Sequence, residues 1–208
     1  MTPAAAPAPA HDLGELLGLR GPSILWGRVL TFFLAWWLCS LPATIYMAQR
    51  FSRWPDSSFW IFDFLGSLLL TALLVISMRN ISGDIGAALV ACVAYALLAP
   101  VVQWLSRPSG FRSLSLLAPL PHFGPFFALL GVALALRQVR PQWLALWVGS
   151  LAGFTFSYLF FWLWSAAYLA RAHAPLGLSS QDASALALNL LTATLFALVF
   201  EGLSRLLE

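Results

Sequence analysis

Long apolar stretches alternate with short polar connectors along the chain, and this pattern predicts a bundle of membrane helices. The longest stretch covers residues 143–170, between Arg140 and Arg171. At about 1.5 Å per residue it extends roughly 40 Å, more than the ~30 Å hydrocarbon core of a bilayer. We therefore expect a membrane helix that tilts or reaches into the headgroup region.

Five further apolar segments bring the expected number of transmembrane helices to about six. The fourth contains Pro119, Pro121 and Pro125, so we expect a non-helical break followed by a short helix over residues 123–136. The predicted fold class is all-α, a polytopic integral membrane protein with a proline-broken fourth segment. The other expected helices cover residues 26–48, 59–78, 85–105 and 180–200.

Three regions of different character follow from this pattern. Residues 1–10 are rich in Ala and Pro and predict a disordered tail. Residues 11–20 place their leucines on one side and predict an amphipathic helix at the membrane interface, with an unstructured lead-in as the alternative. Residues 24–208 are expected to form a single six-helix transmembrane domain.

Composition supports a place in the bilayer. Of 208 residues, 61% are hydrophobic and 9% are charged, which leaves too little polar surface for a soluble globule. The net charge of +3 comes from arginines at the ends of apolar runs, so nucleic acid is not an expected partner. We expect the cell inner membrane, with cytoplasmic termini because the amino-terminal segments are easiest to place there. The arginine distribution itself does not choose a side.

Two strips of small residues predict close helix packing. Gly149 and Gly153 lie one turn apart in the longest stretch, and Ala88, Cys92 and Ala96 follow at steps of four in the third. Small side chains let two helix backbones approach closely in a membrane. We expect the two strips to pack against each other or against a partner protein.

Five polar or aromatic residues are candidates for ligand binding. Asp63 lies about one turn inside the second span, as an interfacial carboxylate or as part of a site. His122 lies at the proline break, where it is a headgroup-region histidine or a ligand group. Asn189 either bonds to another helix or lines a cavity. Trp162 and Trp164 of the longest stretch offer flat surfaces to a ligand.

Motifs for catalysis or cofactor binding are missing from the sequence. We find no HExxH, GxSxG, phosphate-binding loop or CxxC pair, so neither a metal site nor a cofactor is predicted. Cys39 and Cys92 are interpreted as buried small hydrophobes. A thiol that binds a soft metal is the alternative, and no neighbouring ligand supports it.

Three functions are compatible with these features. The first is a membrane subunit that binds or takes up a small, possibly vitamin-like molecule together with partner proteins; its size and helix number are similar to those of substrate-binding components of vitamin transporters. The second is a non-catalytic structural or assembly subunit of a membrane complex. The third is an intramembrane lipid-modifying enzyme that uses Asp63, His122 or Glu201.

Overall fold

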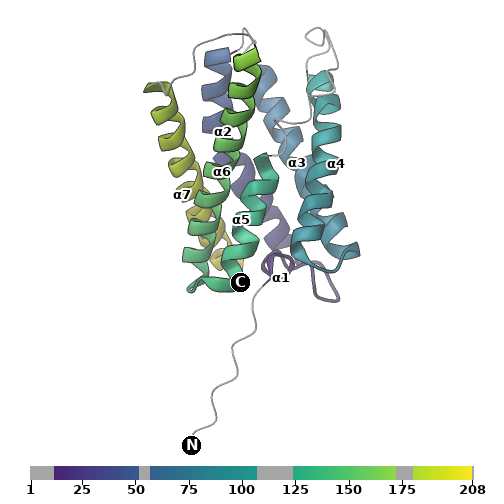
Figure 1. Ribbon diagram of the computed structural model, residues 1–208. Coiled ribbons are helices and arrows are strands. Elements are labelled where there is room, and N and C mark those ends of the chain that lie inside the picture. The colour runs from purple at the N-terminus through teal and green to yellow at the C-terminus, as the bar shows by residue number, and fades with distance from the viewer. Residues whose placement is uncertain (1–11, 52–56, 107–123, 172–179, 208) are drawn as a thin grey trace, which may run out of the picture.

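The computed structural model describes residues 12–51, 57–106, 124–171 and 180–207 (Figure 1). These residues form helices and connecting turns, and no strand occurs among them. The helices are α1 (Leu13–Leu16), α2 (Trp26–Phe51), α3 (Ser57–Asn80), α4 (Asp84–Ser106), α5 (Gly124–Gln138), α6 (Gln142–Arg171) and α7 (Ser180–Leu207). The all-α prediction is therefore confirmed for the described part of the chain.

Three helical stretches are long and apolar enough to cross a membrane, as judged by length and composition within the described residues. They are Asp63–Asn80 of α3, Gln142–Phe160 of α6 and Ala187–Leu207 of α7. Shorter apolar stretches occur in α2, α4 and α5. Large apolar side chains such as Leu97, Leu163 and Leu198 are more than 60% exposed on the outside of the bundle. Such a surface is compatible with contact to the lipid hydrocarbon. The lengths and the composition of these helices therefore indicate a membrane protein.

Helices α2 to α7 form a closed ring. Each packs against the next in the sequence, and α7 returns to pack against α2. Successive helices run in opposite directions, so α2 begins and α7 ends at the end of the bundle where α1 lies (Figure 1). This end is called the α1 end below. Helix α5 has only 15 residues, and the proline break expected before it lies outside the described residues.

The closest contact in the ring joins α5 to α6 through glycines. A Cβ atom on Gly149 would lie 2.6 Å from the carbonyl oxygen of Gly131, and one on Gly153 would lie 2.4 Å from Ala128 Cα. Real side chains do not approach so closely, so each position requires glycine. The expected pairing of this face with the strip at Ala88 is wrong. Because α5 and α6 are joined by residues 139–141 alone, this hairpin brings its own two helices together first.

The alanine strip of α4 is buried elsewhere in the bundle. Ala88, Cys92 and Ala96 are at most 1% exposed, and α4 packs mainly against α3. The side chain of Tyr95 in α4 lies over Gly66 of α3, where an added Cβ would be 3.1 Å from the tyrosine oxygen. Both small-residue strips are thus buried by contacts within the chain.

The residues of α1 fill the interior of the ring at its α1 end. Leu13, Leu16 and Leu17 are at most 6% exposed. They meet apolar side chains from four helices around a residual cavity of about 10 Å³, no more than one water molecule needs. These ring side chains are Phe32 of α2, Leu129 and Val132 of α5, Leu146 of α6, and Phe196 and Phe200 of α7.

A layer of aromatic rings lies next to the plug, the name used here for Leu13, Leu16 and Leu17. Phe196 of α7 is 6.1 Å from Phe32 and 6.0 Å from Trp36 of α2, measured between ring centroids. Trp36 continues to Phe154 of α6 at 5.8 Å. These separations are typical of packed aromatic pairs, so the interior is filled where α2, α6 and α7 meet.

The amphipathic segment predicted at residues 11–20 has a shorter helix than expected, the four residues of α1. Its leucines face the bundle interior in this structure. The apolar side of this segment therefore packs inside the protein in this structure. Its placement at a membrane surface stays a prediction.

Candidate functional site

Two carboxylates are buried among the described residues, at opposite ends of the ring. Asp63 lies in the first third of α3 and is 8% exposed, whereas Asp84 opens α4 and is fully buried. A carboxylate is costly to bury unless hydrogen bonds or charges stabilise it. The groups around each one therefore show what it is suited to do.

Asp63 accepts a hydrogen bond from Ser40 of α2. Ser40 Oγ lies 3.0 Å from both carboxylate oxygens and 2.9 Å from the carbonyl oxygen of Trp37. A hydroxyl has one proton, so it serves either the carboxylate or the carbonyl at a given moment. Ser40 can therefore turn to Trp37 when another donor binds Asp63, and its proton stays paired.

Aromatic contacts join the two helices that carry Ser40 and Asp63, and a tyrosine of a third helix lies near the carboxylate. Phe64, next to Asp63, makes edge-to-face contacts with Trp37 at 5.2 Å and with Phe33 at 5.4 Å between ring centroids. Tyr95 of α4 lies close enough to Asp63 to interact electrostatically. A buried carboxylate is a suitable partner for a positively charged or hydrogen-bond-donating group.

A polar strip continues from Asp63 along α3. Ser67 and Thr71 follow at steps of four and are 4% and 6% exposed. Thr71 Oγ1 donates to the carbonyl oxygen of Ser67 at 2.8 Å, so its proton is satisfied within the helix. The strip thus has a structural explanation, and the carboxylate distinguishes Asp63 from the rest of it.

The other predicted ligand residues do not gather around Asp63. Asn189 lies on α7, and α2 separates α7 from α3 in the ring. Its side-chain nitrogen is buried, with no hydrogen-bond partner within the described residues. His122 lies outside the described residues. Trp162 and Trp164 belong to α6, but their side chains are outside the described part.

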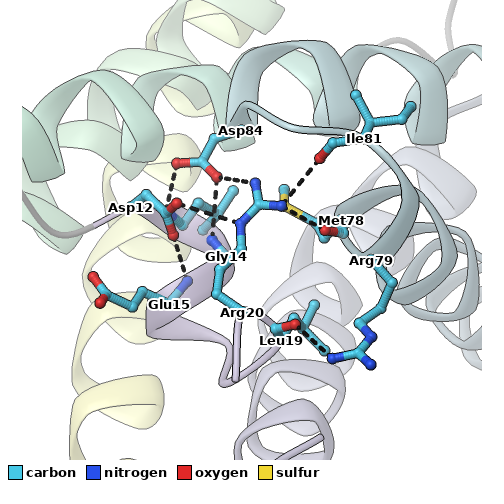
Figure 2. Close-up of polar contacts among 10 residues, drawn as sticks. Asp12, Gly14, Glu15, Leu19, Arg20, Met78, Arg79, Ile81 and Asp84 are labelled. Atoms are coloured by element: carbon cyan, nitrogen blue, oxygen red, sulfur yellow. Dashed lines mark hydrogen bonds and ion pairs between the residues drawn. The ribbon is translucent and has the colours of Figure 1, made fainter. Parts of the chain in front are cut away.

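Asp84 is the centre of a cluster that the sequence did not reveal (Figure 2). Its Oδ2 accepts from the backbone nitrogen of Leu13 at 2.8 Å, and its Oδ1 accepts from Arg20 Nη2 at 3.0 Å. The arginine also donates to the carbonyl oxygens of Met78 and Ile81 at 2.6 and 3.0 Å. One guanidinium thus ties the plug to the end of α3 and the start of α4.

Asp12 and Arg79 complete this cluster. Asp12 caps α1 by accepting from the Glu15 backbone nitrogen and pairs with Arg20 at 3.3 Å. Arg79 Nη1 donates to the carbonyl oxygens of Leu19 and Gly21 at 3.2 and 2.8 Å. Backbone groups in the first turn of α1 and in the turn that follows the helix therefore bind charged side chains.

A metal centre is not visible in the described part of the chain. No group of three or more His, Cys, Asp or Glu side chains is close enough there to hold an ion. Cys39 and Cys92 are free thiols, buried at 2% and 0% exposure, as expected for small core residues.

No known family, curated protein or solved structure matches this chain.

Proposed function

We propose that this chain is a membrane subunit that binds a small molecule at Asp63, at the end of the helix ring opposite α1. The ligand class is an organic molecule with a cationic or hydrogen-bond-donating group. As a subunit for uptake across the cell inner membrane, it would work with partner proteins that supply the driving force. No motif for ATP hydrolysis occurs in its sequence.

Six membrane spans, α2 to α7, are part of this proposal. At 1.5 Å per residue, the 23 residues of α4 and the 30 of α6 give lengths of about 35 and 45 Å. The 15 residues of α5 give only about 22 Å, less than the hydrocarbon core. An even number of spans places the start of α2 and the end of α7 on one side, which we assign to the cytoplasm.

The observation that carries the proposal is the shared hydroxyl of Ser40. A buried carboxylate with a purely structural role is best held by donors that have no alternative acceptor. Ser40 instead has a second acceptor at the Trp37 carbonyl, 2.9 Å away, so a ligand can take its place at Asp63 without leaving a proton unpaired. This arrangement supports exchange of the carboxylate between an internal donor and an external one.

An assembly subunit is less well supported by the same structure. The sequence basis for that function was the presence of small-residue faces available to a partner. Gly149 and Gly153 contact α5, and Ala88 and Cys92 are completely buried. Neither strip offers a free surface.

An enzyme using Asp63 together with Glu201 is also less well supported. Helices α3 and α7 run in the same direction, with Asp63 near the start of one and Glu201 near the end of the other (Figure 1). Glu201 instead forms an i,i+4 ion pair with Arg205 at 2.7 Å. The two carboxylates therefore cannot act on one substrate atom.

Native mass spectrometry from mild detergent tests the proposal. We expect a non-lipid adduct of reproducible mass on the wild-type protein, and its loss in Asp63→Asn. Ser67→Ala is the matched control, because it removes a buried polar group one turn away on the same face of α3. Absence of any non-lipid adduct on the wild type, or equal occupancy of Asp63→Asn, would refute the proposed site.

A titration with a panel of vitamins and organic amines complements this measurement. Trp37 lies in ring contact with Phe64 beside the carboxylate, so its fluorescence is expected to change on binding. The change should saturate in the wild type and in Ser67→Ala, and should be lost in Asp63→Asn. A saturating response that is identical in Asp63→Asn would place the ligand elsewhere.

A further inference from the structure

We propose that residues 12–20 form a releasable lid on the helix ring, held closed by a charged latch between Arg20 and Asp84. In the closed state seen here, the leucines of α1 fill the ring at its α1 end. In the open state, the segment lies on the membrane surface and the interior surface between α2, α5, α6 and α7 is uncovered. The inference does not depend on what Asp63 binds.

The environment of a membrane protein makes such a release feasible. In water, expelling Leu13, Leu16 and Leu17 from a protein interior would expose them to solvent. Here they can move into the bilayer interface, whose apolar part is as favourable for leucine as the ring is. The hydrophobic effect therefore contributes little to the choice between closed and open, and packing and polar contacts decide it.

The polar contacts that favour the closed state involve Arg20 and Asp84 above all, and Arg79 adds two, to the carbonyl oxygens of Leu19 and Gly21. Arg20 bonds to Asp84, to the carbonyl oxygens of Met78 and Ile81, and to Asp12. Asp84 has no exposed surface and receives two further bonds, from the backbone nitrogens of Leu13 and Gly14. Bonds between ionised groups are stronger than neutral ones, and more so where water is excluded. Breaking the latch removes an ion pair whose carboxylate is fully buried, and this weakens the closed state relative to the open one.

Two features next to the lid allow its backbone to change direction. Gly18 has a φ of +67°, a conformation that other residues rarely adopt, and it reverses the chain directly after α1. Residues 21–23, which lead into α2, are exposed. The outer side of the lid borders an open depression of about 400 Å³, lined in part by Glu15, Arg20 and Leu25. Only the inner side of the lid is therefore packed against protein.

Thiol labelling in liposomes tests the lid. In a Leu17→Cys reference protein, a polar maleimide should react slowly at position 17, because that side chain is 2% exposed. Adding Arg20→Gln or Asp84→Asn should raise the labelling rate roughly tenfold or more, the effect of losing one charge-assisted hydrogen bond. Peptide mass spectrometry measures maleimide labelling of the native Cys92 in the same molecules. Because Cys92 is completely buried, its continued protection shows that the ring is intact.

Arg205→Gln is the matched control. It also removes an arginine from an ion pair at the α1 end of the bundle, but that pair joins two residues of α7, and Arg205 is 69% exposed. We expect no change at position 17. An unchanged rate at position 17 in both Arg20→Gln and Asp84→Asn would overturn the latch. Equal labelling of position 17 and Cys92 would also overturn it, since the loosening would then be global.

Discussion

The two ends of the ring each bury an aspartate, but they hold it by different means. Asp84 is held by two backbone nitrogens and by the partly buried guanidinium of Arg20, and the backbone nitrogens leave it only when the chain around Leu13 moves. One of the groups that bind Asp63, the hydroxyl of Ser40, has a second acceptor within hydrogen-bond distance. Donors from the backbone and from Arg20 suit a contact that holds the whole segment of residues 12–20 in place, whereas a hydroxyl with a second acceptor suits a carboxylate that meets a ligand. Four substitutions test this comparison, from the largest expected effect to the smallest.

Replacing Asp84 with alanine should have the largest effect. The change leaves Arg20 partly buried without its carboxylate and removes the acceptor for the Leu13 backbone nitrogen. We expect the free energy of unfolding to fall by about 3 kcal/mol, the lower end for breaking a buried ion pair. Thermal unfolding in mild detergent, followed by tryptophan fluorescence, measures this loss. A loss equal to that of an Asp63 variant would abolish the contrast between the two ends.

Replacing Gly149 with alanine should affect both ends together, since α5 and α6 must separate to admit the new methyl group. A loss of about 1–3 kcal/mol in unfolding free energy is expected from such overpacking. Gly202→Ala on α7 is the matched control. Nothing lies within 4 Å of its added Cβ, so the better helix propensity of alanine should raise stability by up to about 1 kcal/mol. If Gly149→Ala and Gly202→Ala change the free energy of unfolding by the same amount, α5 and α6 are not in close contact at Gly149.

Replacing Asp63 with asparagine should cost about 1 kcal/mol or less, because the amide oxygen still accepts from Ser40. Ligand binding, in contrast, should be lost. Parallel measurement of thermal unfolding and of ligand-induced fluorescence separates the two effects. Strong destabilisation with binding retained would reverse the roles assigned to the two aspartates.

Replacing Arg205 with glutamine should have the smallest effect. It breaks an i,i+4 pair on the surface of α7, where Arg205 is 69% exposed. Such pairs contribute about 0.2–0.5 kcal/mol. The same unfolding assay should therefore show almost no shift, and a loss as large as that of Asp84→Ala would mean that charge at this end matters regardless of burial.

The helices themselves were largely predictable from the sequence. Residues 85–105 were expected to be helical and α4 covers Asp84–Ser106; residues 143–170 were expected and α6 covers Gln142–Arg171. The expected short helix at 123–136 corresponds to α5, Gly124–Gln138. Apolar runs bounded by charged residues mark helix ends in a membrane protein, because the bilayer enforces both features.

The pairing of helix faces was not predictable in the same way. The strips at Gly149 and at Ala88 have similar composition, and a pattern within one helix does not name its neighbour. The short link between α5 and α6 decides the pairing, and Gly131, the glycine opposite Gly149, lies between Ala128 and Ala135 at steps of three and four along α5.

The buried latch was missed for a related reason. Arg20 and Asp84 are 64 residues apart, and each looks like an ordinary interfacial or turn residue. One signal was present, namely an acidic residue in the first turn of a helix, which marks a place where donors converge. Asp63 was found from the sequence because an acid among aromatic residues stands out there, but its partner Ser40 was not.

The contact between α2 and α7 has a consequence for how the protein is made. It is the one seam of the ring that joins helices distant in the chain, and α7 is synthesised last. Phe196 and Phe200, which line the place of the plug, belong to that helix. During biogenesis the residues of α1 thus have no complete binding place until the last helix inserts. Closure of the amino-terminal segment can then occur only in chains whose insertion has been completed.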